Sequence, residues 1–208
     1  MAETLPLPAT SMVNAALPVL SDPRTRVLRN VGLAIVGSLL IIAAAKVKVP
    51  FWPVPMTLQT LAVLGLGAAY GARLGAATVA LYIAYGLFGL PVFTNTPPVA
   101  AGPLYLLGPT GGFLIGFVAA AAIAGWAGSR GASLWRLAGG VVLAEIALMT
   151  LGFGWLALGA QMASGATGIG FAKAWAAGVA PFLLGDLIKA ALAASLVGAG
   201  WSVLKRRG

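Results

Sequence analysis

Long apolar stretches with few charged residues recur along this chain, and they constrain its fold more than any other feature. Six of them cover residues 27–45, 57–71, 74–90, 110–128, 137–160 and 178–204. A helix needs about 20 apolar residues to cross a bilayer. Only 8% of the 208 residues are charged, too few to cover the surface of a soluble domain of this size. The sequence therefore predicts an all-α integral membrane protein with six transmembrane helices.

The basic residues near the ends of these stretches predict how the helices are oriented. If the N-terminus lies inside, nine lysines and arginines fall on the cytoplasmic side and three on the outer side. The nine are Arg24, Arg26, Arg29, Arg73, Arg130, Arg136, Lys205, Arg206 and Arg207, and the three are Lys46, Lys48 and Lys173. This asymmetry follows the positive-inside rule, so we expect both termini to be cytoplasmic.

Three regions follow from this topology. Residues 1–26 are expected to form a mobile cytoplasmic tail, residues 27–204 the membrane domain, and residues 205–208 a basic cytoplasmic tail. The net charge of +9 is explained by topology and by contact with the lipid bilayer, so no nucleic-acid partner is expected.

The last apolar stretch carries two charges, Asp186 and Lys189, three residues apart. On a helix this spacing places both side chains on one face. Charges within a membrane span are costly and usually mark a functional site that faces a cavity. The alternative is an internal salt bridge that only positions the helix. Glu145 should lie at a similar depth, so a pair between Glu145 and Lys189 is a further alternative that the sequence leaves open.

Residues 91–109 form a long connection with five prolines and no charge. Loops of this length are usually functional, and we expect this one to fold over the outer end of the protein as a lid. Asn95 lies in the lid and is the best candidate for an amide contact with a ligand. Gln59, Phe93 and Tyr82 are further candidates near the same end, although Tyr82 also suits core packing. The set suits a small, partly apolar ligand held by a few hydrogen bonds.

The sequence lacks the residues that several classes of activity require. The chain contains neither cysteine nor histidine, which removes thiol chemistry and the usual zinc and haem ligands. No phosphate-binding loop with its lysine is present, and no nucleophile–base constellation is evident. We therefore expect no catalytic residues, no metal site and no cofactor, and we do not expect an enzyme.

Small residues recur every four positions in several stretches, as at Gly67, Gly71 and Gly75. Such rows let the backbones of neighbouring helices approach closely. Ala34 and Ser38 make a similar row in the first stretch. Most of these rows should pack internally, and the weaker alternative is that the row in the first stretch faces outward and docks another membrane protein.

Four ordered motifs resemble the BioY family, the biotin-binding membrane subunit (S component) of energy-coupling factor (ECF) vitamin importers. They are Pro53-Val-Pro-Met-Thr-Leu-Gln-Thr, Gly86-Leu-Phe-Gly-Leu-Pro-Val-Phe, Gly108-Pro-Thr-Gly-Gly-Phe-Leu-Ile-Gly-Phe and Gly185-Asp-Leu-Ile-Lys. The resemblance covers most of residues 27–204 and leaves out the first 26.

The resemblance implies a six-helix bundle in the bacterial cytoplasmic (inner) membrane that binds biotin from the outer side. Asp186 and Lys189 would contact the biotin head group, and Asn95 is the closest match to an asparagine of the lid that also contacts biotin. The implied partners are a transmembrane coupling subunit (T component) and cytoplasmic ATPase subunits (A components). The missing phosphate-binding loop agrees with ATPases on separate chains.

Two other functions remain open at this stage. The acidic residues within the spans also fit a stand-alone proton-coupled vitamin transporter, with Asp186 or Glu145 as the proton carrier. A purely structural membrane subunit is the third possibility, but it leaves the uncharged lid without a purpose.

Overall fold

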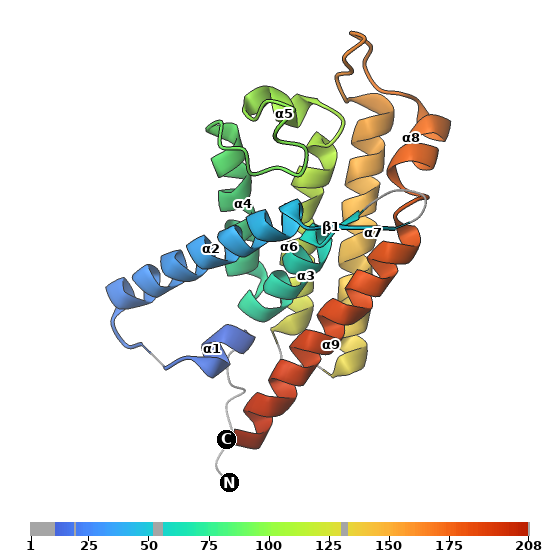
Figure 1. Ribbon diagram of the computed structural model, residues 1–208. Helices are drawn as coiled ribbons and strands as arrows, with labels where there is room; N and C mark the ends of the chain where they lie inside the picture. Colours follow the sequence, from blue (N-terminus) through green and yellow to red (C-terminus); the bar gives the residue numbers. More distant parts are fainter. Residues whose placement is uncertain (1–10, 19, 52–55, 130–132, 208) are drawn as a thin grey trace.

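The computed structural model describes residues 11–18, 20–51, 56–129 and 133–207, and it is almost entirely helical (Figure 1). The helices are α1 (Met12–Ala16), α2 (Pro23–Lys46), α3 (Gln59–Tyr70), α4 (Ala72–Leu87), α5 (Pro103–Leu107), α6 (Gly111–Gly128), α7 (Leu134–Leu158), α8 (Phe171–Gly178) and α9 (Leu183–Arg207). Strands β1 (Lys48–Val49) and β2 (Met56–Thr57) form a two-stranded antiparallel sheet.

The long apolar helices lie where the sequence predicted them. Helices α2, α6, α7 and α9 are long and apolar enough to cross a membrane, so the protein is membrane-embedded and multi-pass. Helices α3 and α4 have 12 and 16 residues. At the usual rise these span about 18 and 24 Å, less than the roughly 30 Å of a bilayer core. Six crossings and the side on which the termini lie stay predictions.

Local sequence signals fix where the helices begin. Asp22 caps α2 by accepting a 2.8 Å hydrogen bond from the Thr25 N–H, and Pro23 occupies the first turn. Hydrogen bonds from Thr25 hold the pKa of Asp22 below its usual value. Gly71 has φ of 84°, a conformation that glycine adopts without strain, and it separates α3 from α4. Helix α2 therefore starts at Pro23, before the predicted residue 27.

Helix α6 lies at the centre of the bundle, packed against α3, α4 and α7, while α9 packs against α3 and α7 and α2 packs against α4 and α3. The predicted close approach at small residues is confirmed. A Cβ atom on Gly67 would lie 2.6 Å from the Ala121 carbonyl oxygen, and one on Gly116 would lie 2.9 Å from Leu148 Cδ1. Ala34 and Ser38 are 8% and 0% exposed, so this row packs inside the protein rather than facing outward.

The residues before α2 make contacts that the sequence did not predict. Residues 11–26 were predicted to belong to a mobile tail, but α1 packs against α3 and α9, because the apolar side chains of Met12 and Val13 join the core. Residues 1–10 lie outside the described residues. Residues 52–55 also lie outside the described residues, and β1 and β2 pair on either side of them, with Val49 opposite Met56.

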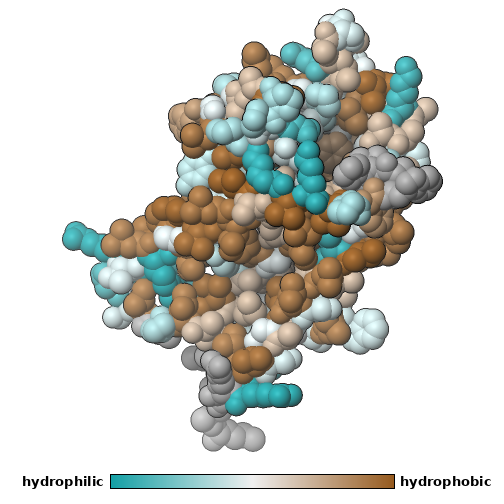
Figure 2. Space-filling view, in the orientation of Figure 1, coloured by the Kyte–Doolittle hydropathy of each residue, from teal (hydrophilic) through white to brown (hydrophobic). Residues whose placement is uncertain are grey.

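Apolar residues extend across the middle of the face shown in Figure 2, over α2 and α9. Hydrophilic residues lie at the N-terminal end of α2 and the C-terminal end of α9 in the same view. Figure 1 shows α5 and α8 at one end of the bundle, and α1 with the last turns of α9 at the other. This distribution suits a bundle surrounded by lipid, with one end formed by the predicted lid.

Candidate ligand-binding site

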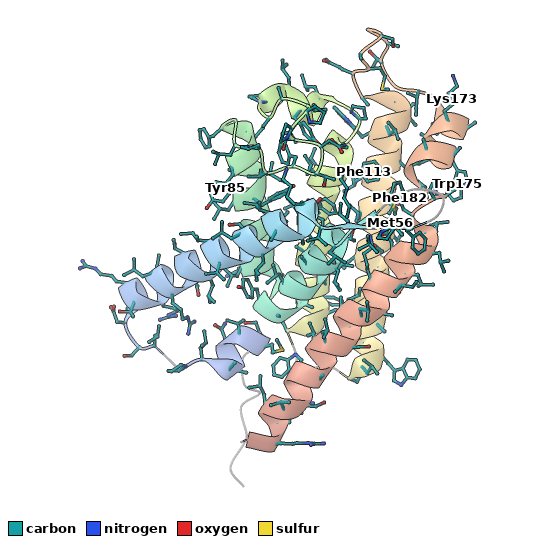
Figure 3. The ribbon with its side chains drawn as sticks, viewed as in Figure 1. Met56, Tyr85, Phe113, Lys173, Trp175 and Phe182 are labelled. Atoms are coloured by element: carbon teal, nitrogen blue, oxygen red, sulfur yellow. The ribbon has the colours of Figure 1, made fainter. Side chains whose placement is uncertain are left out.

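A cavity of about 550 Å³ lies at the lid end of the bundle, between residues of α3, α4, α6, α7 and α9. This volume falls in the range usual for small-molecule sites. Most of the wall is apolar, and Met56, Phe113 and Phe182 lie together near the start of α9 (Figure 3). The polar lining residues are Thr57, Gln59, Thr60, Tyr82, Thr94, Asn95, Tyr105, Thr110, Asp186 and Lys189.

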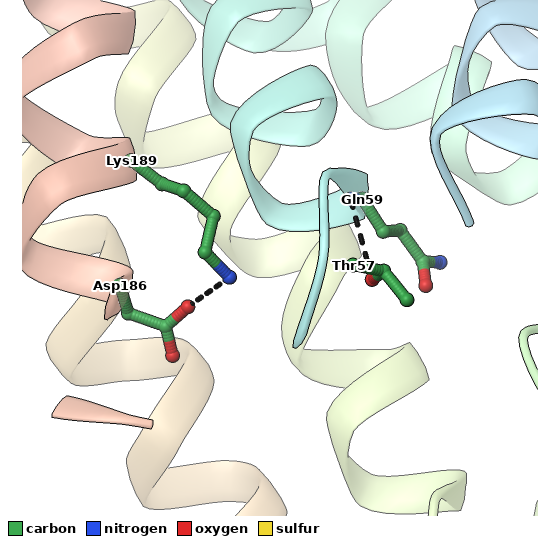
Figure 4. Close-up of polar contacts among 4 residues, drawn as sticks. All are labelled: Thr57, Gln59, Asp186 and Lys189. Atoms are coloured by element: carbon green, nitrogen blue, oxygen red, sulfur yellow. Dashed lines mark hydrogen bonds and ion pairs between the residues drawn. The ribbon is translucent and has the colours of Figure 1, made fainter. Parts of the chain in front are cut away.

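An ion pair forms one wall of this cavity. Lys189 Nζ lies 2.6 Å from Asp186 Oδ1, and their side chains are only 10% and 6% exposed. Both come from the start of α9, where the three-residue spacing puts them on one face as predicted. Figure 4 shows them facing the corner between β2 and α3, where Thr57 and Gln59 lie. The helix N-terminus also stabilises a carboxylate at Asp186.

Glu145 does not take part in this pair. Both of its carboxylate oxygens are buried and have no hydrogen-bond partner among the described residues. It lies on α7, which packs against α9, and its charge interacts with those of Asp186 and Lys189. In the structure Lys189 thus pairs with Asp186, which resolves the alternative that the sequence left open.

A chain of hydrogen bonds forms the opposite wall. The Thr94 hydroxyl donates to Gln59 Oε1 at 3.1 Å, and Gln59 Nε2 donates to the Tyr82 hydroxyl at 2.9 Å. Gln59 is oriented further by its backbone N–H, which donates to Thr57 Oγ1 at 3.4 Å. The chain joins the lid to α3 and α4, so the orientation of the Gln59 amide is fixed without a ligand.

The lid is held to this wall by an aromatic cluster. Phe93 meets Tyr82 edge to face at 5.6 Å and stacks on Tyr105 at 4.4 Å. It also fills the space that a Cβ atom on Gly86 would occupy. Phe93 is 1% exposed, so it contributes mainly by anchoring the lid, whereas Asn95 is exposed at the edge of the cavity.

The structure brings all six predicted site residues to this one cavity: Asp186, Lys189, Asn95, Gln59, Phe93 and Tyr82. That they contact a ligand stays a prediction. Sequence reasoning missed Tyr105, because it expected no helix within residues 91–109 and α5 lies there. Thr94 was not among the six predicted residues either, and the signal that could have found it was its position beside Asn95 in the lid.

The arrangement suits binding rather than catalysis. A carboxylate that accepts and an ammonium that donates stand side by side in a mostly apolar cavity, where charge-assisted hydrogen bonds are strong. A ligand with adjacent N–H donors and a carbonyl acceptor would complement both groups at once. The apolar wall would hold the rest of such a molecule.

Comparisons with known proteins find relatives that are named biotin transporters. Biotin transporters named BioY from Thermotoga maritima and Rhodobacter capsulatus are 35% and 36% identical, over 74% and 77% of this chain and 85% and 87% of theirs. A probable biotin transporter BioY from Pyrococcus horikoshii is 36% identical over 72% of this chain and 82% of its own.

A solved structure, the S component for biotin from an ECF-type ABC transporter, shares the fold with a TM-score of 0.68. It is 23% identical to this chain, and the match covers 90% of this chain and 96% of that one. The BioY family itself matches residues 12–206, so the match begins before the resemblance seen in the sequence motifs. With so much of its length matched, this chain belongs to the BioY family.

Proposed function

We propose that this chain captures biotin at the outer face of the membrane and imports it as the S component of an ECF-type ABC transporter. The observation that carries the proposal is the buried Asp186–Lys189 pair in a cavity of about 550 Å³ beneath the lid. The relatives named as biotin transporters support biotin as the substrate. They also agree with the expectation that the chain is not an enzyme.

The chemistry of biotin fits the two kinds of wall. The ureido ring of biotin has two N–H donors and a carbonyl acceptor. Asp186 would accept from the N–H groups and Lys189 would donate to the carbonyl, both as charge-assisted hydrogen bonds. Phe113 and Phe182 would pack against the apolar parts of the ligand, and Gln59, Tyr82 and Phe93 would form the fixed wall behind it. Asn95 would meet the ligand from the lid.

The energy for import would come from other chains. We infer that a T component and cytoplasmic A components drive this protein, because the chain has no phosphate-binding loop and the structural neighbour is an S component of such a transporter. The location would be the bacterial cytoplasmic membrane, with six crossings and both termini in the cytoplasm. The other partner of this protein would be the lipid bilayer, and the proposed function requires neither nucleic acid nor a cofactor.

Calorimetric titration of the purified protein in detergent tests the substrate. Biotin should bind one to one and tightly, while thiamine should give no heat and dethiobiotin, which keeps the ureido ring, should bind. Absence of heat with biotin, in protein whose helical content and thermal melt show that it is folded, would overturn the proposal. Pull-down with T and A components then tests the partners separately.

One observation favours a second source of energy. Glu145 keeps a buried carboxylate without a hydrogen-bond partner among the described residues, and such groups within membranes can carry protons. The protein would then act as a stand-alone proton-coupled vitamin transporter. Uptake of labelled biotin into vesicles that contain only this chain, abolished by an uncoupler, would support that function, and dependence on added A and T components would exclude it.

A further inference from the structure

The part of the lid that reaches the cavity is a tight turn. The Thr96 N–H donates to the Phe93 carbonyl at 3.1 Å, which closes the turn over residues 93–96. Its two central residues, Thr94 and Asn95, line the cavity. Its two end residues are buried, with Phe93 1% and Thr96 2% exposed. The position of the ends therefore decides where Thr94 and Asn95 lie.

Lys46 binds both ends of this turn. Its ammonium donates to the Phe93 carbonyl at 2.5 Å and to the Thr96 carbonyl, and the Thr96 hydroxyl lies 3.5 Å away. An ammonium has three donors, and three oxygens from the lid surround this one. The Thr96 hydroxyl in turn donates to the Phe93 carbonyl at 2.8 Å, so Lys46 completes a closed set of hydrogen bonds at the base of the turn.

The same contact joins the lid to the first long helix. Lys46 is the last residue of α2, a helix that otherwise packs against α3 and α4. Lys46 does not line the cavity, so any contact-based influence on a ligand passes through the turn. Much of its side chain is exposed, and solvent therefore weakens the contact compared with a fully buried one.

We propose that Lys46 is a positioning residue for ligand retention: by binding the Phe93 and Thr96 oxygens it holds Thr94 and Asn95 over the cavity. The inference rests on the proposed biotin function for its ligand but not for its geometry. It predicts that losing the ammonium speeds ligand dissociation more than it slows association, because an open lid still admits the ligand.

Lys46→Met tests this inference, and Lys48→Met is its matched control. Methionine keeps an unbranched side chain but has no donor. Lys48 is two residues away, is exposed, and makes no side-chain hydrogen bond or ion pair with any other described residue. Chase of bound labelled biotin should show dissociation about tenfold faster for Lys46→Met, the effect of one charge-assisted hydrogen bond. Association should change by less than twofold, and Lys48→Met should match the wild type.

Hydrogen exchange of the ligand-free protein gives a second readout. The backbone amides of residues 93–96 and of Val99 should exchange faster in Lys46→Met, while those of α6 and α7 stay unchanged. Thr96→Val removes only one of the three oxygens and should give a smaller change in the same direction. It keeps the test decisive if Lys46→Met does not fold.

The two proposals fail in different ways. If the wild-type protein does not bind biotin, the proposed function falls while hydrogen exchange still tests Lys46. If biotin binds but Lys46→Met, or Thr96→Val in its place, leaves both dissociation and lid exchange at wild-type values, the positioning role is wrong. If Lys48→Met changed the association and dissociation rates of biotin as much as Lys46→Met does, the positioning role would also be contradicted, because surface charge alone would then explain the effect.

Discussion

The two polar walls of the cavity differ in the kind of interaction that holds their side chains. On the α3–α4 side, Thr94, Gln59 and Tyr82 bind one another in sequence. On the α9 side, Asp186 and Lys189 pair only with each other among the described residues, although a carboxylate and an ammonium can together make several more hydrogen bonds. The first wall is oriented by hydrogen bonds within the protein, whereas the two charges of the second have bonding capacity left for a ligand. The comparison suggests that α9 recognises the ligand and that the opposite wall shapes the space.

Removing Lys189 should produce the largest effect, because it leaves Asp186 as an unpaired buried charge. We expect Lys189→Met to lose biotin binding and to lower the free energy of unfolding by about 3–5 kcal/mol. Thermal melting in detergent and calorimetric titration measure the two effects. The double variant Asp186→Asn with Lys189→Met should recover most of the stability but not the binding. Recovery of binding in the double variant would show that α9 supplies only structure.

Asp186→Asn should lower biotin affinity with a smaller loss of stability than Lys189→Met. The amide keeps the shape of the side chain and can still accept a hydrogen bond, but it loses the charge. We expect biotin affinity to fall by about 1.5–3 kcal/mol, the contribution of a hydrogen bond to a charged group. Titration with biotin measures this, with Glu145→Gln as a control that retains affinity if Glu145 lies outside the site. Unchanged affinity in a folded Asp186→Asn protein would remove that residue from the site.

Much of the α9 wall could be predicted from the sequence, because its key interaction is local. Asp186 and Lys189 are three residues apart, and helical geometry alone places them together. The apolar stretches likewise predicted the long helices, since the need to face lipid acts on every residue of a span. The sequence could not decide whether Lys189 pairs with Asp186 or Glu145, because that choice depends on how α7 packs against α9.

The opposite wall and the lid could be predicted only in part. Gln59, Tyr82 and Thr94 come from three separate segments, and no spacing in the sequence shows that they bond to one another. The role of Lys46 could not be predicted, because its backbone partner at Thr96 lies 50 positions later in the chain. From the sequence alone, Lys46 only flanked the first span. Helix α5 was not predicted, because the prolines of residues 91–109 indicated a loop without regular structure.

Filling the space beside Phe93 should disturb the wall formed by Thr94, Gln59 and Tyr82 without touching the charged one. A Cβ atom on Gly86 would overlap the Phe93 ring, so Gly86→Ala should push the lid away from Tyr82. We expect a loss of about 1–3 kcal/mol in stability, the usual cost of overpacking, and faster biotin dissociation. Gly32→Ala on α2 is the control, since nothing lies within 4 Å of its Cβ position. Equal melting temperatures for the two variants would mean that Phe93 does not anchor the lid.

Thr94→Val should give the smallest change and the sharpest comparison between the walls. Valine has nearly the same shape but removes the hydroxyl that donates to Gln59 Oε1. The lost hydrogen bond should lower stability by about 0.5–1.5 kcal/mol. Because Thr94 bonds to Gln59 and not to the Asp186–Lys189 pair, the enthalpy of biotin binding should stay close to that of the wild type, unlike that of Asp186→Asn. A loss of affinity as large as that of Asp186→Asn would place direct ligand recognition on both walls, and the division between a shaping wall and a recognising wall would then be wrong.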